Sequence, residues 1–175
     1  MKKLPYLLIL FLVLSACAPV RVDYDYDKTT NFSTYKTYNY YSPLNTGLSE
    51  LDTKRLLTAF DTAMQAKGFT LSDTPDFLVN IQSQEFQDVQ RNNVGVGVGG
   101  GGGNVGGGIS IGIPVGQPDI NREIIFDFVD DSKTGLFWQA VSASGYSPKA
   151  TPEAREAQFQ KIVTKVLAQY PPEVK

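Results

Sequence analysis

The clearest chemistry in this chain belongs to Cys17, its only cysteine. Cys17 follows the small residues Ser15 and Ala16 at the end of an apolar run that extends from Leu4 to Leu14. The basic start Met1-Lys2-Lys3 precedes this run, so the segment has the layout of a secretory signal with a small-residue cleavage site. The run is too short to cross a membrane, which takes about 20 apolar residues.

The box Leu14-Ser15-Ala16-Cys17 resembles the bacterial lipobox, in which the thiol is acylated, the peptide is cut before the cysteine and the new amine is acylated. The resemblance implies that residues 1–16 are a cleaved signal peptide and that Cys17 carries palmitate-type chains. Several acyl chains on one residue anchor a protein stably. Ala18 stands where an aspartate would resemble an inner-membrane retention signal, so we expect an outer-membrane anchor that faces the periplasm.

Histidine is absent from the sequence, and this absence limits the possible reactions. It removes Ser-His-Asp and Cys-His catalysis and the zinc sites built on histidine. Because Cys17 is expected to carry lipid, no thiol remains for catalysis or for a disulfide within the chain. We therefore predict a non-enzymatic protein with no catalytic residues, no cofactor and no metal ligands.

Two partial motifs match known sites only in outline. Ser33-x-x-Lys36 and Lys133-Thr134-Gly135 spell two signatures of penicillin-binding enzymes, but Ser33 and Lys36 fall in a β-type pattern, which would place them on opposite faces. Asp23-x-Asp25-x-Asp27 opens like a calcium loop, but the glycine and glutamate that must follow are missing. Both patterns favour a structural interpretation.

Aromatic residues in the predicted strands leave a second interpretation open. Exposed rings could stack on a glycan such as peptidoglycan, although aromatic side chains in strands more often belong to the core. The 18 acidic residues could also include a hydrolytic carboxylate pair. The alternatives to a non-enzymatic protein are therefore a cell-wall glycan-binding module or a carboxylate- or tyrosine-based hydrolase. The aromatic set is Tyr35, Tyr38, Tyr40, Tyr41 and Trp138.

Residues 95–116 form a glycine-rich insertion, with 12 glycines among 22 residues. Its flanks alternate apolar residues with glycine or serine, which is unlike a flexible linker. We predict a hairpin or loop whose apolar residues pair with a partner by strand addition, or edge to edge in an assembly. These candidate partner-binding residues are Val94, Val96, Val98, Ile109, Ile111 and Ile113.

Charge argues against nucleic acid as a partner. The formal net charge is −2, and removal of residues 1–16 takes away Lys2 and Lys3, which leaves −4. A mildly acidic chain without a basic cluster has little attraction for phosphate backbones. The partners that remain are the membrane, through the anchor on Cys17, and another envelope protein or peptidoglycan.

The order of predicted elements indicates an α+β fold. After a tether at 17–19, strands are predicted over 20–27, 32–41, 77–86, 124–129 and 136–146, with helices over 50–67 and 152–170. Ser49 and Thr151 are the expected N-caps, and Gly68 ends the first helix. We predict one domain over 20–175, with a mainly antiparallel sheet and both helices on one face.

Short motifs along nearly the whole mature chain resemble a bacterial lipoprotein family known only as a domain of unknown function, of the domain-of-unknown-function 4136 type. The resemblance implies the fold and an envelope location, and it carries no catalytic residues. Its motifs are Val22-Asp23-Tyr24-Asp25, Phe32 to Tyr38, Lys67-Gly68-Phe69, Asp131 to Gly135, Trp138 and Tyr170-Pro171-Pro172.

Overall fold

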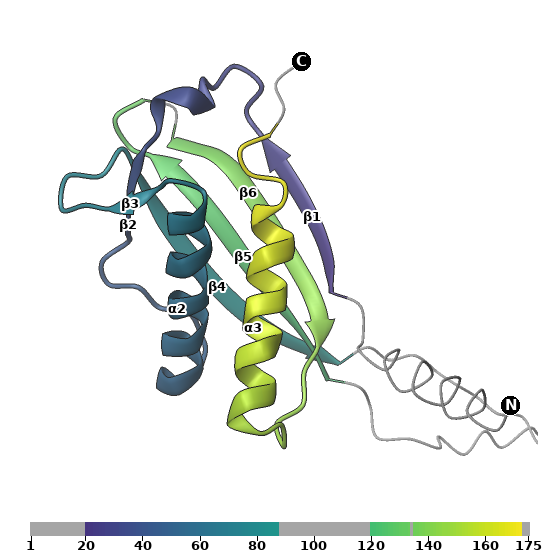
Figure 1. Cartoon of the computed structure of the whole chain (residues 1–175). Helices are drawn as coiled ribbons and strands as arrows, with labels where there is room; N and C mark the ends of the chain where they lie inside the picture. Colours follow the sequence, from purple (N-terminus) through teal and green to yellow (C-terminus); the bar gives the residue numbers. More distant parts are fainter. Residues whose placement is uncertain (1–19, 88–119, 134, 173–175) are drawn as a thin grey trace, which may run out of the picture.

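Six strands of the chain form one mixed sheet, shown in the computed structural model of Figure 1. The structure describes residues 20–87, 120–133 and 135–172. The strands lie in the order β1-β6-β5-β4-β2-β3; β2 is parallel to β3 and β4, and the other pairs are antiparallel. Their bounds are β1 Arg21–Tyr26, β2 Thr37–Tyr40, β3 Thr70–Leu71, β4 Phe77–Gln87, β5 Ile120–Asp130 and β6 Gly135–Gly145.

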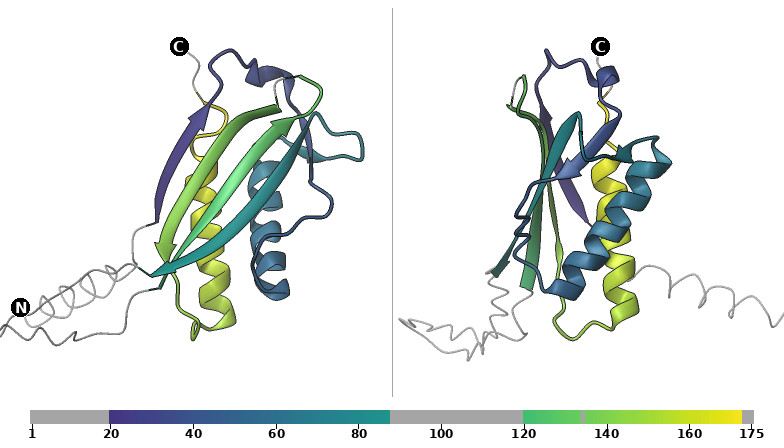
Figure 2. Two further views of the ribbon diagram at one scale, coloured as in Figure 1. Left: turned by 180° about the vertical axis from the view of Figure 1, so that it is seen from behind. Right: turned by 90° about the vertical axis from the view of Figure 1, so that its left-hand side faces the viewer.

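Two helices, α2 (Glu50–Ala66) and α3 (Pro152–Leu167), lie on one face of the sheet, and no helix of the described residues covers the opposite face (Figure 2). The side chain of Ser49 accepts from the backbone N–H of Asp52, and Thr151 accepts in the same way from Ala154. Gly68 follows α2 with φ of 88°. The predicted α+β class, the mainly antiparallel sheet and both N-caps are confirmed.

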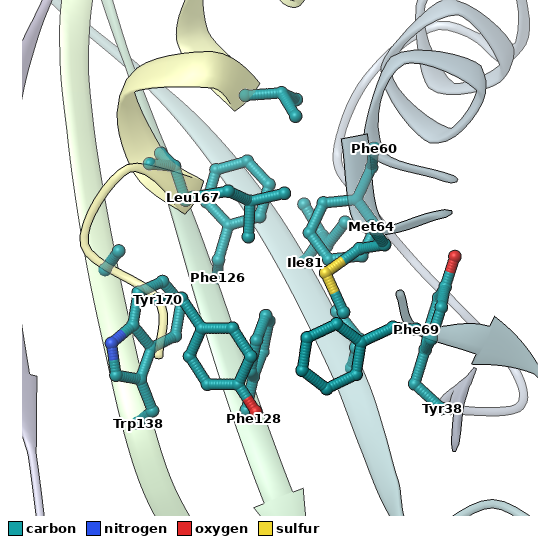
Figure 3. Packing of buried hydrophobic residues seen from close by; sticks show 14 of the residues in the cluster. Tyr38, Phe60, Met64, Phe69, Ile81, Phe126, Phe128, Trp138, Leu167 and Tyr170 are labelled. Carbon is teal, nitrogen blue, oxygen red and sulfur yellow. The ribbon is translucent and has the colours of Figure 1, made fainter. Parts of the chain in front are cut away.

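The core lies between the helices and the sheet. Phe126 and Phe128 of β5 alternate with half-buried residues, so their side chains point to the helical face, as the period of two requires. Phe128, Trp138 and Tyr170 pack together there, with ring centroids 4.5 to 5.1 Å apart (Figure 3). The interior is therefore dominated by aromatic rings.

The predicted strand over 32–41 is wrong in its first half. Residues Phe32–Thr34 form a short 3₁₀ helix, η2, and the strand is limited to Thr37–Tyr40. The side chain of Asn31 accepts from the backbone N–H and the hydroxyl of Ser33, and such local bonds offer the backbone an alternative to a ladder.

A further strand lies between α2 and β4, where the sequence predicts none. Thr70–Leu71 forms β3, in which the N–H of Thr70 donates to the carbonyl of Lys36 at 3.1 Å. A two-residue strand has no periodicity of its own. It is specified by the carbonyl groups that the neighbouring edge of the sheet presents.

One end of the sheet gathers the start of β1, the end of β4 and the start of β5 (Figure 1). Val20, the first described residue, is 3% exposed, and its carbonyl accepts from Nζ of Lys165 on α3 at 2.9 Å. This hydrogen bond fixes the start of the described chain against α3.

Candidate functional site

A groove of about 850 Å³ runs between α2 and α3 on the side of the helices that faces away from the sheet. Its α2 wall extends from Leu51 to Lys67, which is about 24 Å at the helical rise of 1.5 Å per residue. The opposite wall comes from α3, between Glu156 and Ala168. An elongated groove of this length matches about four turns of a helix.

The sequence leaves this groove open because α2 has two different stripes. Leu56, Phe60 and Met64 are fully buried on the stripe that faces the sheet. The neighbouring stripe carries Ala59 and Ala63, both lining the groove. Because alanine side chains are short, the space between the two helices is not filled.

The groove has one large exposed apolar residue and a mainly basic rim. Leu51 is 65% exposed at one end of the groove. Lys54, Arg55 and Lys67 line the α2 side, whereas Glu156 is the single acidic residue among the lining. The surface is therefore apolar along its floor and attracts negative charge along one wall.

A buried ion cluster fixes the two helices beside the groove. Asp52 has a side chain that is 2% exposed and accepts from Nη1 of Arg55 at 2.8 Å and from Nη1 of Arg155 at 2.7 Å. Arg155 also donates to the carbonyl of Ala150 at 3.1 Å and to that of Pro148 at 2.7 Å. The guanidinium of Arg155 thus ties the turn before α3 to the first turn of α2.

The hydroxyl groups of two tyrosines on β2 bond to a single carboxylate of α2. The hydroxyls of Tyr38 and Tyr40 donate to Oδ1 of Asp61 at 2.7 and 2.6 Å. Burial and the hydrogen bond to Asp61 raise the pKa of both tyrosines well above the usual value. Both hydroxyls therefore keep their protons at neutral pH and act as hydrogen-bond donors to Asp61.

A second tyrosine–carboxylate pair lies at the β5–β6 turn. The hydroxyl of Tyr35 donates to Oδ2 of Asp130 at 3.0 Å, and Nζ of Lys133 lies 3.1 Å from the same oxygen. Burial, followed by the bond to Asp130, raises the pKa of Tyr35 to about 12. Burial disfavours the charged form of Asp130, but hydrogen bonds from Ser132, Lys133 and Tyr35 outweigh it and hold the pKa of Asp130 below its usual value.

The sequence-predicted anchor and partner-binding residues lie outside the described part of the chain. Cys17 falls in residues 1–19, and the whole glycine-rich insertion falls in residues 88–119. The expected lipidation and strand addition therefore stay predictions. The proposed contact of a partner with the six apolar residues of this insertion and its flank likewise stays a prediction; these are Val94, Val96, Val98, Ile109, Ile111 and Ile113.

The residues of the partial motifs make structural contacts. The hydroxyl of Ser33 donates to Asn31 at the start of η2, so the β conformation predicted for Ser33 is wrong. Lys133 pairs with Asp130 at the β5–β6 turn. Asp27 accepts from Thr29. Across the described residues, no three acidic or cysteine side chains gather in a way that could hold a metal ion.

The aromatic set belongs mainly to the core. Tyr35, Tyr38 and Trp138 are at most 3% exposed, and Tyr40 and Tyr41 are partly buried. These rings do not form the exposed platform that a glycan would need. Glu156 is the single acidic lining residue of the groove, and Asp52 is that of a smaller cavity beside α3, so neither of these two cavities holds a carboxylate pair.

Sequence reasoning missed the groove itself. The spacing of Leu51, Ala59 and Ala63 on α2 could have indicated it, because small residues beside a core stripe mark a second helical face. No local pattern in the sequence indicates that α3 packs opposite that face. Neither helix in the described part has the length and hydropathy needed to cross a membrane.

A family model described as "Domain of unknown function (DUF4136)" matches residues 22–172, which includes both helices and the six strands except for Arg21, the first residue of β1. The chain belongs to the DUF4136 family. The family description assigns no activity, and none of the curated proteins matches the sequence. The resemblance of the motifs to this domain of unknown function is thus confirmed, whereas the lipoprotein nature and the envelope location stay predictions.

Solved structures share the DUF4136 fold. A DUF4136 family protein from Bacteroides thetaiotaomicron is similar with a TM-score of 0.51 and 15% identity, over 87% of this chain and 96% of that one. A PDZ domain protein from Parabacteroides distasonis is similar with a TM-score of 0.56 and 12% identity, over 98% of this chain. This chain spans 40% of that protein's length. At these identities the likeness concerns the fold alone.

Proposed function

We propose that this DUF4136 protein is a lipid-anchored periplasmic module without enzymatic activity that holds another envelope protein in the α2–α3 groove. The observation that carries the proposal is the groove itself, which is long and apolar along its floor. Surfaces of this shape take an amphipathic helix whose apolar side chains recur every three or four residues.

The charged residues along the groove indicate which kind of helix it binds. The α2 wall presents Lys54, Arg55 and Lys67 against Glu156 on the α3 wall. A helix with an apolar stripe and acidic residues on the flank next to α2 complements this arrangement, and complementary charge orients a helix in a groove. The proposed occupant is therefore an acidic amphipathic helix of another envelope protein.

The proposed lipid anchor on Cys17 supports the same role, that of a module that holds another envelope protein. Cys17 stands three residues before the buried Val20, and three residues reach at most about 11 Å. A lipid on Cys17 would hold the β1 end of the sheet next to the membrane. The groove would then be presented to proteins that lie at the same membrane surface.

Site-specific photo-crosslinking in cells tests the proposal. A photoreactive residue at Thr58, exposed on the groove, should join one helical segment with an acidic flank, identified by mass spectrometry of the crosslinked peptides. Leu51→Asp should reduce this product at least tenfold, since a leucine anchor in a groove contributes about 1.5 kcal/mol or more. The control is Leu136→Asp, because Leu136 is 50% exposed and lies outside the groove.

Charge reversal gives the second readout. Lys54→Glu with Lys67→Glu should weaken the crosslink, and reversal of the acidic residues in the captured helix should restore it. Equal crosslinking in the Leu51→Asp and Leu136→Asp proteins would contradict the groove as the binding surface.

A further inference from the structure

A second cavity, of about 160 Å³, lies between the start of β5, the end of β6 and the first half of α3. Arg122, Arg155 and Tyr146 line it together with the apolar side chains of Phe159 and Ile162. It shares none of its lining residues with the α2–α3 groove. What it can bind is decided by Arg122.

Arg122 is a cation placed where the fold otherwise puts hydrophobic residues. It is 8% exposed and heads the β5 row that continues with Ile124 and Phe126 on the helical face. Its Cζ lies over the ring of Tyr146, 3.5 Å from the ring centroid, which is a close cation–π contact. This contact holds the guanidinium in one orientation.

The donors of Arg122 are only partly used. Nη2 donates to Oε1 of Glu85 at 2.6 Å, whereas the buried Nε has no hydrogen-bond partner. A buried donor without an acceptor is costly, so native proteins rarely leave one. Nε and Nη2 form one edge of the guanidinium, and a carboxylate that binds this edge accepts from both nitrogens.

Glu85 does not fill that edge. Its side chain is 49% exposed and reaches Nη2 with a single oxygen. Nε is itself buried, so a ligand carboxylate must displace Glu85 before it can accept from Nε and Nη2. Glu85 can turn to solvent at little cost because half of its side chain is already exposed.

The charges and walls of the cavity favour one negative charge. Arg122 and Arg155 line it against Asp52, which leaves one positive charge in excess. A dianion would place surplus negative charge beside Asp52, in a cavity whose walls are mainly apolar. The volume equals that of about five water molecules, which leaves room for a carboxylate and a few carbon atoms.

We propose that the Arg122 cavity binds a monocarboxylate that carries a short apolar group. The carboxylate bridges Nε and Nη2 of Arg122, and the apolar group lies against Phe159 and Ile162. Two sources supply this chemistry: a free short-chain acid and the C-terminal carboxylate of a peptide with small side chains.

Nuclear magnetic resonance of the Arg Nε–Hε groups tests the site directly. The ¹⁵N-labelled full chain in detergent micelles is titrated with butyrate, with N-acetyl-Ala-Ala, and with inorganic phosphate at matched ionic strength. Either carboxylate should shift the Nε resonance of Arg122 in a saturable manner and leave that of Arg21, which is exposed on β1, in place. Whichever of the two carboxylates binds tighter identifies the source.

Two substitutions separate binding from folding. Glu85→Gln removes the competing carboxylate from an exposed position and should tighten butyrate binding by about tenfold. Arg122→Lys keeps the charge but loses the two-nitrogen edge, and should weaken binding at least tenfold, while Arg21→Lys should change nothing.

Two results would overturn the proposal. One is an Arg122 Nε resonance that stays fixed up to about 100 mM of both carboxylates in the unmodified and the Glu85→Gln proteins, since a millimolar site would be nearly full there. That result means the cavity holds water alone. The other is a saturable shift with phosphate but with neither carboxylate, which would exclude the ligand class.

Discussion

Asp52 is a buried carboxylate that receives guanidinium groups from two elements far apart in the sequence. Its Oδ1 and Oδ2 each accept from one arginine, Arg55 within α2 and Arg155 on α3. Removing this carboxylate is far more costly than removing an exposed charge, because two partly buried guanidinium groups, 23% and 22% exposed, lose their counter-charge. This residue therefore controls how α2 and α3 are joined.

We expect Asp52→Asn to lower the free energy of unfolding by about 3 kcal/mol, measured by urea denaturation of the full chain. Glu50→Gln is the matched control, because Glu50 lies in the same first turn of α2 but is exposed. The control removes the same favourable interaction with the helix dipole and should cost about 0.5 kcal/mol. Equal losses would show that Asp52 acts through the dipole and not through the arginines.

Tyr35 gives the fold a dependence on alkaline pH. Its pKa is raised to about 12 by burial and by the bond to Asp130, so the folded state holds the hydroxyl proton more tightly than the unfolded state. The stability that this proton contributes is complete below pH of about 10 and is lost as the pH rises through about 12.

Tyr35→Phe should make the free energy of unfolding less dependent on pH in that window. One group titrating only in the unfolded state changes stability by up to about 1.4 kcal/mol per pH unit, and the substitution removes this slope. Urea denaturation at pH values between about 9 and 12 measures it. Tyr24→Phe is the control, since Tyr24 is 45% exposed, and an equal effect of both substitutions would contradict the assignment.

At the scale of elements, the loop from β2 to α2 is held against the edge of β4 by a close backbone approach. The N–H of Ser83 donates to the carbonyl of Thr46 at 2.8 Å. Gly47 has φ of 70°, and a Cβ there would lie 2.7 Å from the carbonyl oxygen of Ser83. Backbone conformation and lack of space therefore both require glycine at this position.

Gly47→Ala should destabilise the protein by about 2 to 3 kcal/mol, from left-handed backbone strain and a clash with main-chain atoms. Gly68→Ala is the control, because Gly68 also has positive φ, but a Cβ added there would meet nothing within 4 Å. The control should lose about 1 kcal/mol. Thermal unfolding of both variants measures the difference, and equal losses would exclude the contact with Ser83 as a factor.

At the scale of the whole molecule, the proposed lipid on Cys17 would lie only three residues before Val20, the first residue of the described fold. The core begins at Val20, and Lys165 of α3 binds its carbonyl, so a lipid three residues earlier would leave little free tether. The end of the sheet where β1 starts would then face the membrane, and the opposite end, which carries the β5–β6 turn, would point into the periplasm.

Cys17→Ser should abolish metabolic labelling with palmitate and move the protein from the membrane fraction to the soluble periplasmic fraction. The physical reason is that the apolar segment before Cys17 is too short to hold the protein by itself. Ser15→Thr, which leaves the cysteine in place, is the control for processing. Continued palmitate labelling of the Cys17→Ser protein would contradict the anchor.

Elements with local signals could be predicted from the order of residues alone. The caps Ser49 and Thr151 and the helical stripes predicted α2 and α3, and alternation predicted the long strands. These signals succeed because each depends on neighbours within one turn or one pleat. The same reasoning failed at Phe32–Thr34 and Thr70–Leu71, where a side-chain bond and a neighbouring strand edge decide the backbone.

The positions of the two proposed binding surfaces, the α2–α3 groove and the Arg122 cavity, depend on tertiary packing. Asp52 and Arg155 are 103 residues apart in the sequence, and Arg122 and Glu85 are 37 apart. The groove exists because α3 packs beside the alanine stripe of α2, and the Arg122 cavity exists because β5, β6 and α3 meet at one end of the sheet. Such sites require contacts between distant elements, which no local pattern of residues encodes.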